Sequence, residues 1–371
     1  MIRAARRLPA LALVALAAFA LAASTATATG GDAPGSLYTQ TNDPAGNRVQ
    51  VIAQSPGGAL TLGRSYPTGG LGTGGGLSNQ GSVVLAKRWL LATNAGSDEL
   101  SIFRVGRRGL ILTDVVPSGG DQPVSVTSDG ATAYVVNAGG SGNVSGFAIA
   151  DDGRLTPIAG SSRPLSAAGA GPAEIERSPD GGTLVVTERL TNRIDTYPLA
   201  ADGSVGAPTI TPSAGETPFG FAFDGHGRLF VADAFGGVPN ASAMSSYALV
   251  SGGGVTAIDP VEKTLQTAAC WVALSPDQRF AYTTNTGSNS ITGYRIAKDG
   301  GLSRLDTDGV TATTGAGPTD MAVGGDGRHL FALNAADGTI SGFRLRKDGG
   351  LDPAGTLTGL PAGAVTGLAA R

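Results

Sequence analysis

The chain has 371 residues, of which 59 are glycine, 15% are charged and 41% are hydrophobic, and its formal net charge is −3. The apolar fraction is too high for a disordered chain, and the only long apolar span lies at the N-terminus, which excludes a polytopic membrane protein. A globular protein rich in turns and small residues remains, and this composition favours an all-β fold.

The first part of the chain has the composition of an export signal. Three arginines lie within the first seven residues, residues 8–23 are apolar, and residues 26–28 read Ala-Thr-Ala. This order is typical of a secretory signal peptide that is cleaved after Ala28. We therefore expect residues 1–28 to be a signal peptide, residues 29–35 to be a flexible N-terminus, and the mature protein to be secreted.

Two further expectations follow from this segment. The apolar run is shorter than the ~20 residues of a membrane-spanning helix, so no integral membrane segment is expected after processing. Removing residues 1–28 takes away three arginines and no acid, which leaves 23 basic and 29 acidic side chains and a net charge of −6. A chain with this charge and no basic patch is not expected to bind nucleic acid.

From residue 36 onwards one pattern recurs seven times. Each copy has a short apolar run that ends in a polar residue, then a loop of small residues, an alternating strand, a Gly-rich turn and a last strand. The polar residues that end the runs lie 43 to 52 residues apart, which is about the length of a four-stranded propeller blade. They are Asn42, Asn94, Asn137, Glu188, Asp233, Asn285 and Asn334.

The last complete copy shows how strands are assigned to the pattern. Residues 318–323 are expected to form the innermost strand, residues 330–334 the second and residues 339–345 the third, and a fourth begins at Leu351. Asp-Gly pairs lie in the turns between strands, where a tight hairpin needs positive φ. Their aspartates are therefore interpreted as turn formers rather than as calcium ligands.

The two ends of the repeat region predict how the ring closes. The first copy begins at Tyr38 without an innermost strand, and residues 363–369 form a lone strand at the other end. Pairing the two leaves no open sheet edge. The prediction is an all-β, seven-bladed β-propeller of four-stranded blades, a single domain over residues 36–371 that is closed by the C-terminal strand in blade one.

The channel mouth is the predicted site. The starts of the innermost strands and the ends of the second strands lie on one face of a propeller, and Trp271 on that face could stack on a ligand. An alternative is that the acids and amides only cap strand ends and bind water, and that Trp271 closes the mouth. The candidate ligand-binding residues are Gln122, Glu174, Phe219, Asp233, Trp271 and Asp320.

Several kinds of chemistry are not expected at this face. The two histidines, His226 and His329, fall on or near the opposite face, which argues against a His base or a His-ligated metal at the mouth. Cys270 is the only cysteine, so no intramolecular disulfide can form. Residues 70–75 fit a Gly-x-Gly-x-x-Gly string but open no helix, and we interpret them as a flexible loop between blades one and two. We expect no metal and no cofactor.

The repeats resemble the lactonase family of seven-bladed propellers. The resemblance rests on Ser-Pro-Asp-Gly at 178–181, Tyr-Val-Val-Asn at 134–137 and Asp-Gly-Gly-Leu at 348–351, and it covers residues 36–370. The family includes the cycloisomerase-type 6-phosphogluconolactonases and the carboxymuconate lactonizing enzymes. The stretch at 38–46 is similar to a secreted bacterial branch labelled carboxymuconate cyclase.

The resemblance implies an active site of His, Arg and Glu at the channel mouth. The family's Pro-His-x-His corresponds to Pro-Val-Ser-Val at 123–126, and its Gly-Pro-Arg-His corresponds to Gly-Pro-Ala-Glu at 171–174. The histidines and the arginine are thus replaced, whereas the family's glutamate matches Glu188. Alternatively, Glu188 pairs with Arg189, Arg193 or a backbone amide as a strand-end cap.

The expected function is therefore binding by a secreted, monomeric propeller that holds a small molecule, a glycan or a protein at its channel mouth. One alternative is a diverged lactone hydrolase or carboxymuconate cyclase-type cycloisomerase, with Glu188 as the catalytic acid or base. A second alternative is an extracellular scaffold. Convergence of Glu174 and Glu188 in an open pocket favours an enzyme, and a mouth plugged by Phe219 and Trp271 favours a scaffold.

Overall fold

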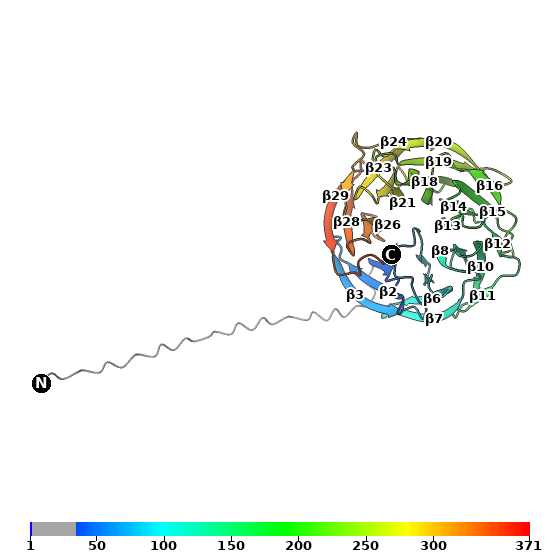
Figure 1. Ribbon diagram of the computed structural model, residues 1–371, viewed down its shortest axis with the longest axis horizontal. Helices are drawn as coiled ribbons and strands as arrows, with labels where there is room; N and C mark the ends of the chain where they lie inside the picture. Colours follow the sequence, from blue (N-terminus) through cyan, green and yellow to red (C-terminus); the bar gives the residue numbers. More distant parts are fainter. Residues whose placement is uncertain (2–34) are drawn as a thin grey trace.

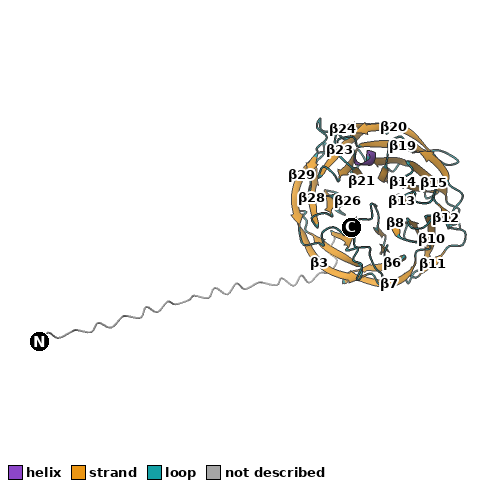
Figure 2. Ribbon diagram, viewed as in Figure 1, coloured by secondary structure: helices purple, strands orange, loops and turns teal. Residues whose placement is uncertain are grey.

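The computed structural model describes Met1 and residues 35–371, and in this part of the chain seven antiparallel sheets form a closed ring (Figure 1). Strands and loops make up the ring, and the short 3-10 helix η1 (Phe235–Gly237) lies in one of its loops (Figure 2). The expected signal peptide and most of the expected flexible N-terminus lie outside the described residues. No helix of the described residues is long and apolar enough to cross a membrane.

Each sheet is one blade, and its strands run from the channel to the rim. The innermost strands of blades one to seven are β30 (Thr366–Ala370), β4 (Val83–Ala86), β8 (Pro123–Ser128), β13 (Pro172–Arg177), β17 (Pro218–Phe223), β21 (Ala269–Leu274) and β26 (Pro318–Val323). The second strands are β1 (Ser36–Gln40), β5 (Trp89–Asn94), β9 (Thr132–Asn137), β14 (Thr183–Glu188), β18 (Arg228–Asp233), β22 (Phe280–Asn285) and β27 (His329–Asn334).

The outer half of each blade completes the sheet. The third strands are β2 (Arg48–Gln54), β6 (Glu99–Gly106), β10 (Asn143–Ile149), β15 (Arg193–Pro198), β19 (Ala243–Leu249), β23 (Ser290–Ile296) and β28 (Thr339–Leu345). The outermost strands are β3 (Leu60–Pro67), β7 (Gly109–Pro117), β11 (Leu155–Pro157) with β12 (Arg163–Pro164), β16 (Thr209–Pro212), β20 (Val255–Lys263), β24 (Leu302–Arg304) with β25 (Ala312–Thr313), and β29 (Leu351–Leu357). This architecture confirms the predicted fold.

Asp-Gly turns join neighbouring blades as well as neighbouring strands. Gly203 has φ of +83° in the turn after β15, and its carbonyl accepts a hydrogen bond of 3.0 Å from the hydroxyl of Tyr134 in the preceding blade. Gly349 repeats this arrangement with φ of +95° and a bond of 2.9 Å from Tyr282. Glycine is required at both positions because the backbone is left-handed there and packs closely against the previous blade.

Apolar side chains fill the spaces between blades. Trp89 and Leu91 of blade two pack with Val126 and Phe147 of blade three in one such cluster. Leu37, Ile52 and Leu368 of blade one pack with Phe331 of blade seven in another. Each blade therefore buries its two faces against its two neighbours, and closing the ring leaves no blade with an uncovered face.

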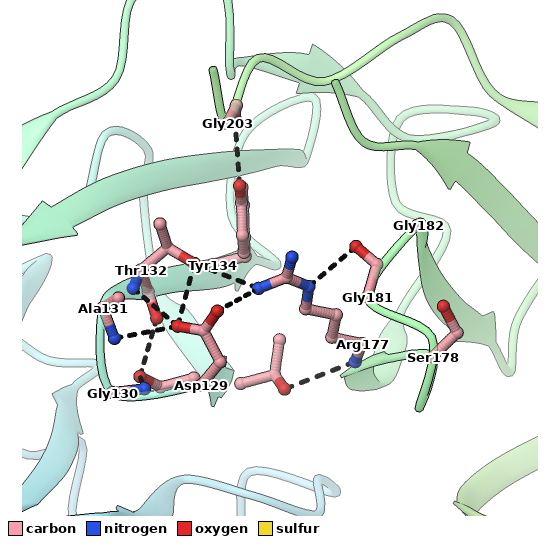
Figure 3. A network of polar contacts seen from close by, with 12 residues as sticks. Asp129, Gly130, Ala131, Thr132, Tyr134, Arg177, Ser178, Gly181, Gly182 and Gly203 are labelled. Carbon is pink, nitrogen blue, oxygen red and sulfur yellow. Dashed lines mark hydrogen bonds and ion pairs between the residues drawn. The ribbon is translucent and has the colours of Figure 1, made fainter. Parts of the chain in front are cut away.

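Polar clamps at the face opposite the mouth also link blades. Arg177 at the end of β13 forms an ion pair with Asp129 in the β8–β9 turn, and its Nε donates to the Gly181 carbonyl at 2.9 Å (Figure 3). Burial raises the pKa of Asp129, but hydrogen bonds from Thr132 and Ala131 and the charge of Arg177 bring that pKa below its usual range. The clamp therefore fixes the orientation of blade four on blade three.

Closure occurs where the sequence predicts it. The C-terminal strand β30 pairs with β1, with Tyr38 opposite Ala369 and Gln40 opposite Thr366. Backbone hydrogen bonds between Ser36 and Arg371 continue this pairing to the end of the strand. The first blade is thus built from both ends of the described chain.

A chain that stops at Gly363 lacks β30, and we expect it to lose its single cooperative unfolding transition. The deletion exposes the edge of β1 and removes Leu368 from the core between blades one and seven. Denaturant unfolding followed by circular dichroism measures this, with a chain that lacks only Arg371 as the control. A truncated chain that unfolds at the parent's midpoint contradicts the closure.

Candidate ligand site at the channel mouth

The polar residues that end the second strands are buried rather than presented to the channel. Asn94 donates to Ser101 Oγ at 2.7 Å, and Asn285 donates to Thr292 Oγ1 at 2.9 Å. In each case the partner lies on the third strand of the same blade. These side chains therefore cap strand ends within their own blades.

Asp233 is also used inside its own blade. Its side chain is inaccessible to solvent, and it accepts a hydrogen bond of 2.5 Å from Ser245 Oγ on β19. Burial raises the pKa of Asp233 to about 8, which the bond from Ser245 and the charge of Lys263 only partly oppose. The structure thus places this predicted ligand-binding residue within blade five.

Glu188, the candidate catalytic carboxylate, is also fully buried. It accepts hydrogen bonds from the Ser166 amide at 2.8 Å, the Ser166 hydroxyl, and Thr191 Oγ1 at 2.5 Å. In the described part of the chain it forms no ion pair with Arg189 or Arg193. Its partners are those of a strand-end cap, supplied by hydroxyl and amide groups.

Two separate groups of acids lie near the mouth. Burial and then the negative charge of Glu188 raise the pKa of Asp195 to about 8. Burial, followed by the charges of Glu176 and Asp320, raises the pKa of Glu174. The convergence of Glu174 with Glu188, which would favour an enzyme, is therefore not seen, and each carboxylate has other acidic neighbours.

Glu174 and Asp320 join the inner strands of neighbouring blades. Glu174 Oε2 accepts the Phe221 amide of β17 at 2.6 Å, and Asp320 Oδ2 accepts the Leu368 amide of β30 at 2.9 Å. Both side chains are at least 95% buried. Burial raises the pKa of Asp320 to about 7, against the effect of its backbone hydrogen bonds.

Part of the connection between blades one and two enters the channel, which the sequence did not predict. The connection from β3 to β4 runs from residue 68 to residue 82, whereas the other connections between blades have four to eight residues. Its last part, residues 77–82, crosses the middle of the ring (Figure 1) and is called the channel plug here. The unusual length of this connection was the available signal in the sequence.

Gln80 is the central residue of the channel plug. Its amide N–H donates to the Ala173 carbonyl at 2.9 Å in blade four. Its side chain bonds both backbone groups of Val272 in blade six, donating to the carbonyl at 2.9 Å and accepting from the amide at 3.1 Å. Between these blades lies Gly220, where a Cβ would overlap Gln80 Oε1.

Phe219 and Trp271 come together at the mouth, and Arg189 joins them. Phe219 and Trp271 have ring centroids 5.3 Å apart in an edge-to-face arrangement. The Arg189 guanidinium carbon lies 5.7 Å from the centre of the Phe219 ring. We call these three residues the mouth cluster.

Arg189 is a partly buried cation. It directly follows β14, and its amide donates to the Gly171 carbonyl at 3.2 Å. Among the described residues its guanidinium has no hydrogen-bond or ion-pair partner, and its Nε is inaccessible to solvent. Burial lowers the pKa of Arg189, although the nearby Cys270 opposes this shift.

The remaining residues of this face are less suited to chemistry. Gln122 directly precedes the innermost strand β8 and is exposed, and its backbone is held in a left-handed conformation with φ of +53°. Burial raises the pKa of Cys270 to about 12, so its thiol stays protonated and is a poor nucleophile. The described residues contain no group of three or more His, Cys, Asp and Glu side chains that could hold a metal ion.

The ring of seven four-stranded blades, closed by its C-terminal strand and with a mouth cluster on one face, defines a seven-bladed β-propeller. The family described as "Lactonase, 7-bladed beta-propeller" matches residues 86–234 and 247–364. The chain belongs to this lactonase family. No curated protein matches the chain.

Solved structures with the same fold span the whole propeller. A protein from Lactobacillus plantarum has a TM-score of 0.71 at 17% identity, over 90% of this chain and 98% of its own. A candidate 6-phosphogluconolactonase from Bacteroides fragilis has a TM-score of 0.69 at 17% identity, over 91% and 98%. The periplasmic gluconolactonase of Pseudomonas aeruginosa has a TM-score of 0.67 at 17% identity, over 90% and 98%. These likenesses establish the fold.

Replacing Gln80 with alanine tests the channel plug. The change leaves the buried amide and carbonyl of Val272 without partners, so we expect the free energy of unfolding to fall by about 2 kcal/mol. Equilibrium denaturation in urea measures the change. The control is Gln122→Ala, which removes an exposed glutamine and should alter stability by less than about 0.5 kcal/mol; equal losses in both variants contradict the role of Gln80.

The buried acids predict that the protein is more stable at pH 5 than at pH 8. The folded state raises their pKa values above the ordinary range near 4, so between about pH 4 and 8 the folded state binds more protons than the unfolded state. Stability then falls as pH rises through this interval, by up to about 1.4 kcal/mol per pH unit for each group. The groups are Glu174, Glu176, Asp195, Asp233 and Asp320.

Thermal unfolding at pH 5, 6, 7 and 8 measures this dependence. Asp233→Asn removes one of the groups without changing the shape of the side chain, and it should make the decline less steep. The surface aspartates with lowered pKa, such as Asp129, lose their contribution only below about pH 4 and do not affect this interval. A midpoint that rises from pH 5 to pH 8 contradicts the prediction.

Proposed function

We propose that this protein binds a small organic anion at its channel mouth, with Arg189 as the anchor. The observation that carries the proposal is a partly buried guanidinium without a partner among the described residues. A cation that is withdrawn from water and left unpaired is unfavourable. A bound carboxylate or phosphate would supply the missing acceptor in the bidentate geometry that arginine favours.

The names of two structural neighbours are consistent with an anionic ligand. They are a gluconolactonase and a candidate 6-phosphogluconolactonase, so the compounds in their names are lactones of acids. In this chain the mouth cluster contains a cation, Arg189. The proposed ligand class is therefore an organic acid or an acid-bearing lactone.

Binding without turnover accounts best for the state of the other residues. Two of the positions that correspond to the family's histidines are Val124 and Val126, and both are 99% buried. The third is Glu174, which accepts the Phe221 amide. Glu188 is engaged by Ser166 and Thr191. A diverged lactone hydrolase that uses Glu188 is the alternative, and it requires these bonds to open.

We further propose that the protein acts outside the cytoplasm as a monomer, after loss of residues 1–28. The order of basic, apolar and small residues at the N-terminus supports export. N-terminal sequencing of protein from the culture medium should give a start at Thr29. Recovery of only the full-length chain, in membranes, contradicts export.

Arg189→Gln should weaken the binding of organic acids about tenfold or more, because it removes the charged donor. Isothermal titration calorimetry with gluconate, 6-phosphogluconate and phenylacetate measures this. The matched control is Arg108→Gln, which removes an exposed arginine from the turn after β6 on the opposite face. If both variants bind as the parent does, or if no acid binds, Arg189 is not the anchor.

The same samples decide between binding and hydrolysis. With gluconolactone and 6-phosphogluconolactone, we expect no acceleration over the spontaneous reaction. Hydrolysis that Glu188→Gln abolishes, while the variant keeps the parent's unfolding midpoint, would instead identify a hydrolase. Acid binding without hydrolysis supports the proposal.

A further inference from the structure

We infer that the anion held at the mouth is an aromatic carboxylate, and that Phe219 selects its ring. This inference rests on the proposed role of Arg189, and it adds the chemical nature of the group that carries the ligand's carboxylate. It follows from three features of the mouth cluster: a rigid aromatic surface beside the cation, neighbouring hydroxyl groups that are engaged within the fold or inaccessible to solvent, and an exposed leucine next to the cation.

The Phe219 ring is a preorganised surface, held in place by its neighbours before a ligand binds. It is only partly buried, whereas Trp271, which packs edge-to-face against it, is 98% buried. Its backbone is held by Thr187 Oγ1, which donates to the Phe219 carbonyl at 2.5 Å. Trp271 in turn packs at Gly220, beside the channel plug. Because the ring is fixed from behind, a ligand meets it without an ordering cost.

The position of Arg189 sets the distance between charge and ring in the ligand. Its guanidinium lies over Phe219 at 5.7 Å from the ring centre, within the range of a cation–π contact. A carboxylate on the guanidinium edge therefore places the adjoining atoms of the ligand against Phe219. Aromatic rings prefer edge-to-face or offset contacts at such spacings, and an aromatic acid with a short linker satisfies both partners.

A polyhydroxylated acid finds few partners in the same place. Thr187 donates to the Phe219 carbonyl, Thr286 donates to the Pro318 carbonyl at 2.7 Å, and Thr191 donates to Glu188. These three hydroxyl groups are thus engaged within the fold. Trp271 Nε1 and the hydroxyl of Thr284, opposite Trp271 in the sheet, have no hydrogen-bond partner among the described residues, but both atoms are inaccessible to solvent. A sugar acid would lose water from its hydroxyl groups without gaining acceptors or donors, which disfavours it.

The rim next to the cation is apolar. Leu190 directly follows Arg189 and is 63% exposed. Its side chain packs at Gly171, the residue that also anchors the Arg189 amide. An exposed leucine beside a partly buried arginine fits a ligand that has an apolar body and a single charged end.

Phenylacetate and cyclohexylacetate test the inference, because they share charge and size and differ in the aromatic ring. Calorimetric titration of the purified full chain should show phenylacetate binding at least about threefold tighter than cyclohexylacetate, and gluconate binding more weakly than both. Phe219→Leu should abolish the preference between the first two acids while both still bind. Phe219→Tyr keeps a ring and should keep the preference, provided that its unfolding midpoint matches the parent's.

The outcomes separate the two proposals. If both acids bind equally and Arg189→Gln weakens both, the anion site stands and the aromatic selection is wrong. If Phe219→Leu leaves the preference unchanged, Phe219 is not the selecting residue and the inference is overturned. If neither acid binds, or if Arg189→Gln has no effect on either, the proposed function fails and the inference fails with it.

Discussion

The fold depends on hydrogen-bond partners for the backbone amides that the innermost strand of each blade turns away from its own sheet. In blades three to seven the innermost strand shifts register near its second residue. The amide of the fourth residue then points out of its own sheet, and an unpaired amide at that depth costs about 1–3 kcal/mol. An acceptor from outside the strand meets this need in four blades: the Gly81 carbonyl for Val126, Ser125 for Ile175, Glu174 for Phe221 and Gln80 for Val272.

This constraint explains both the buried acids and the channel plug. Where the third residue of an inner strand has an acceptor side chain, as with Ser125 and Glu174, it bonds the next blade directly. Gly220 occupies that position in blade five and has no side chain, and Gln80 fills the vacant space and accepts in its place. Residues 80 and 81 of the long connection between blades one and two are therefore part of the ring's bonding, whereas the flexibility expected of residues 70–75 stays a prediction.

The sequence was sufficient for the architecture because the architecture is repetitive. Asp-Gly turns and a spacing of 43 to 52 residues define seven blades, and the predicted strands at 318–323 and 339–345 match β26 and β28 residue for residue. The orphan strand at the C-terminus had one available partner, so its pairing with β1 could be predicted as well.

The direction of individual side chains could not be predicted in the same way. Period and spacing place Glu174, Asp233 and Asp320 on the correct strands, but not whether each carboxyl faces solvent or a backbone amide. In the structure all three serve the fold, and Phe219 and Trp271 remain at the mouth. Arg189 was considered only as a partner of Glu188, because nothing in a single sequence shows that Ser166 and Thr191 reach that carboxylate first.

The position of the mouth cation bears on what the protein does. The resemblance to the lactonase family implies an arginine at the second residue of β13, where this chain has Ala173, which is fully buried. In this chain the guanidinium near the mouth belongs to Arg189, which directly follows β14, the strand that pairs with β13 in the same blade. The positive charge therefore comes from a different backbone position than the one that the resemblance implies. Two of the histidines that the resemblance implies correspond to Val124 and Val126, which pack into the cores on either side of blade three, and the third corresponds to Glu174, which accepts the Phe221 amide. This arrangement is consistent with the proposed binding of an acid by Arg189, whereas turnover of a lactone would require a proton-transfer group such as Glu188 to leave its present partners.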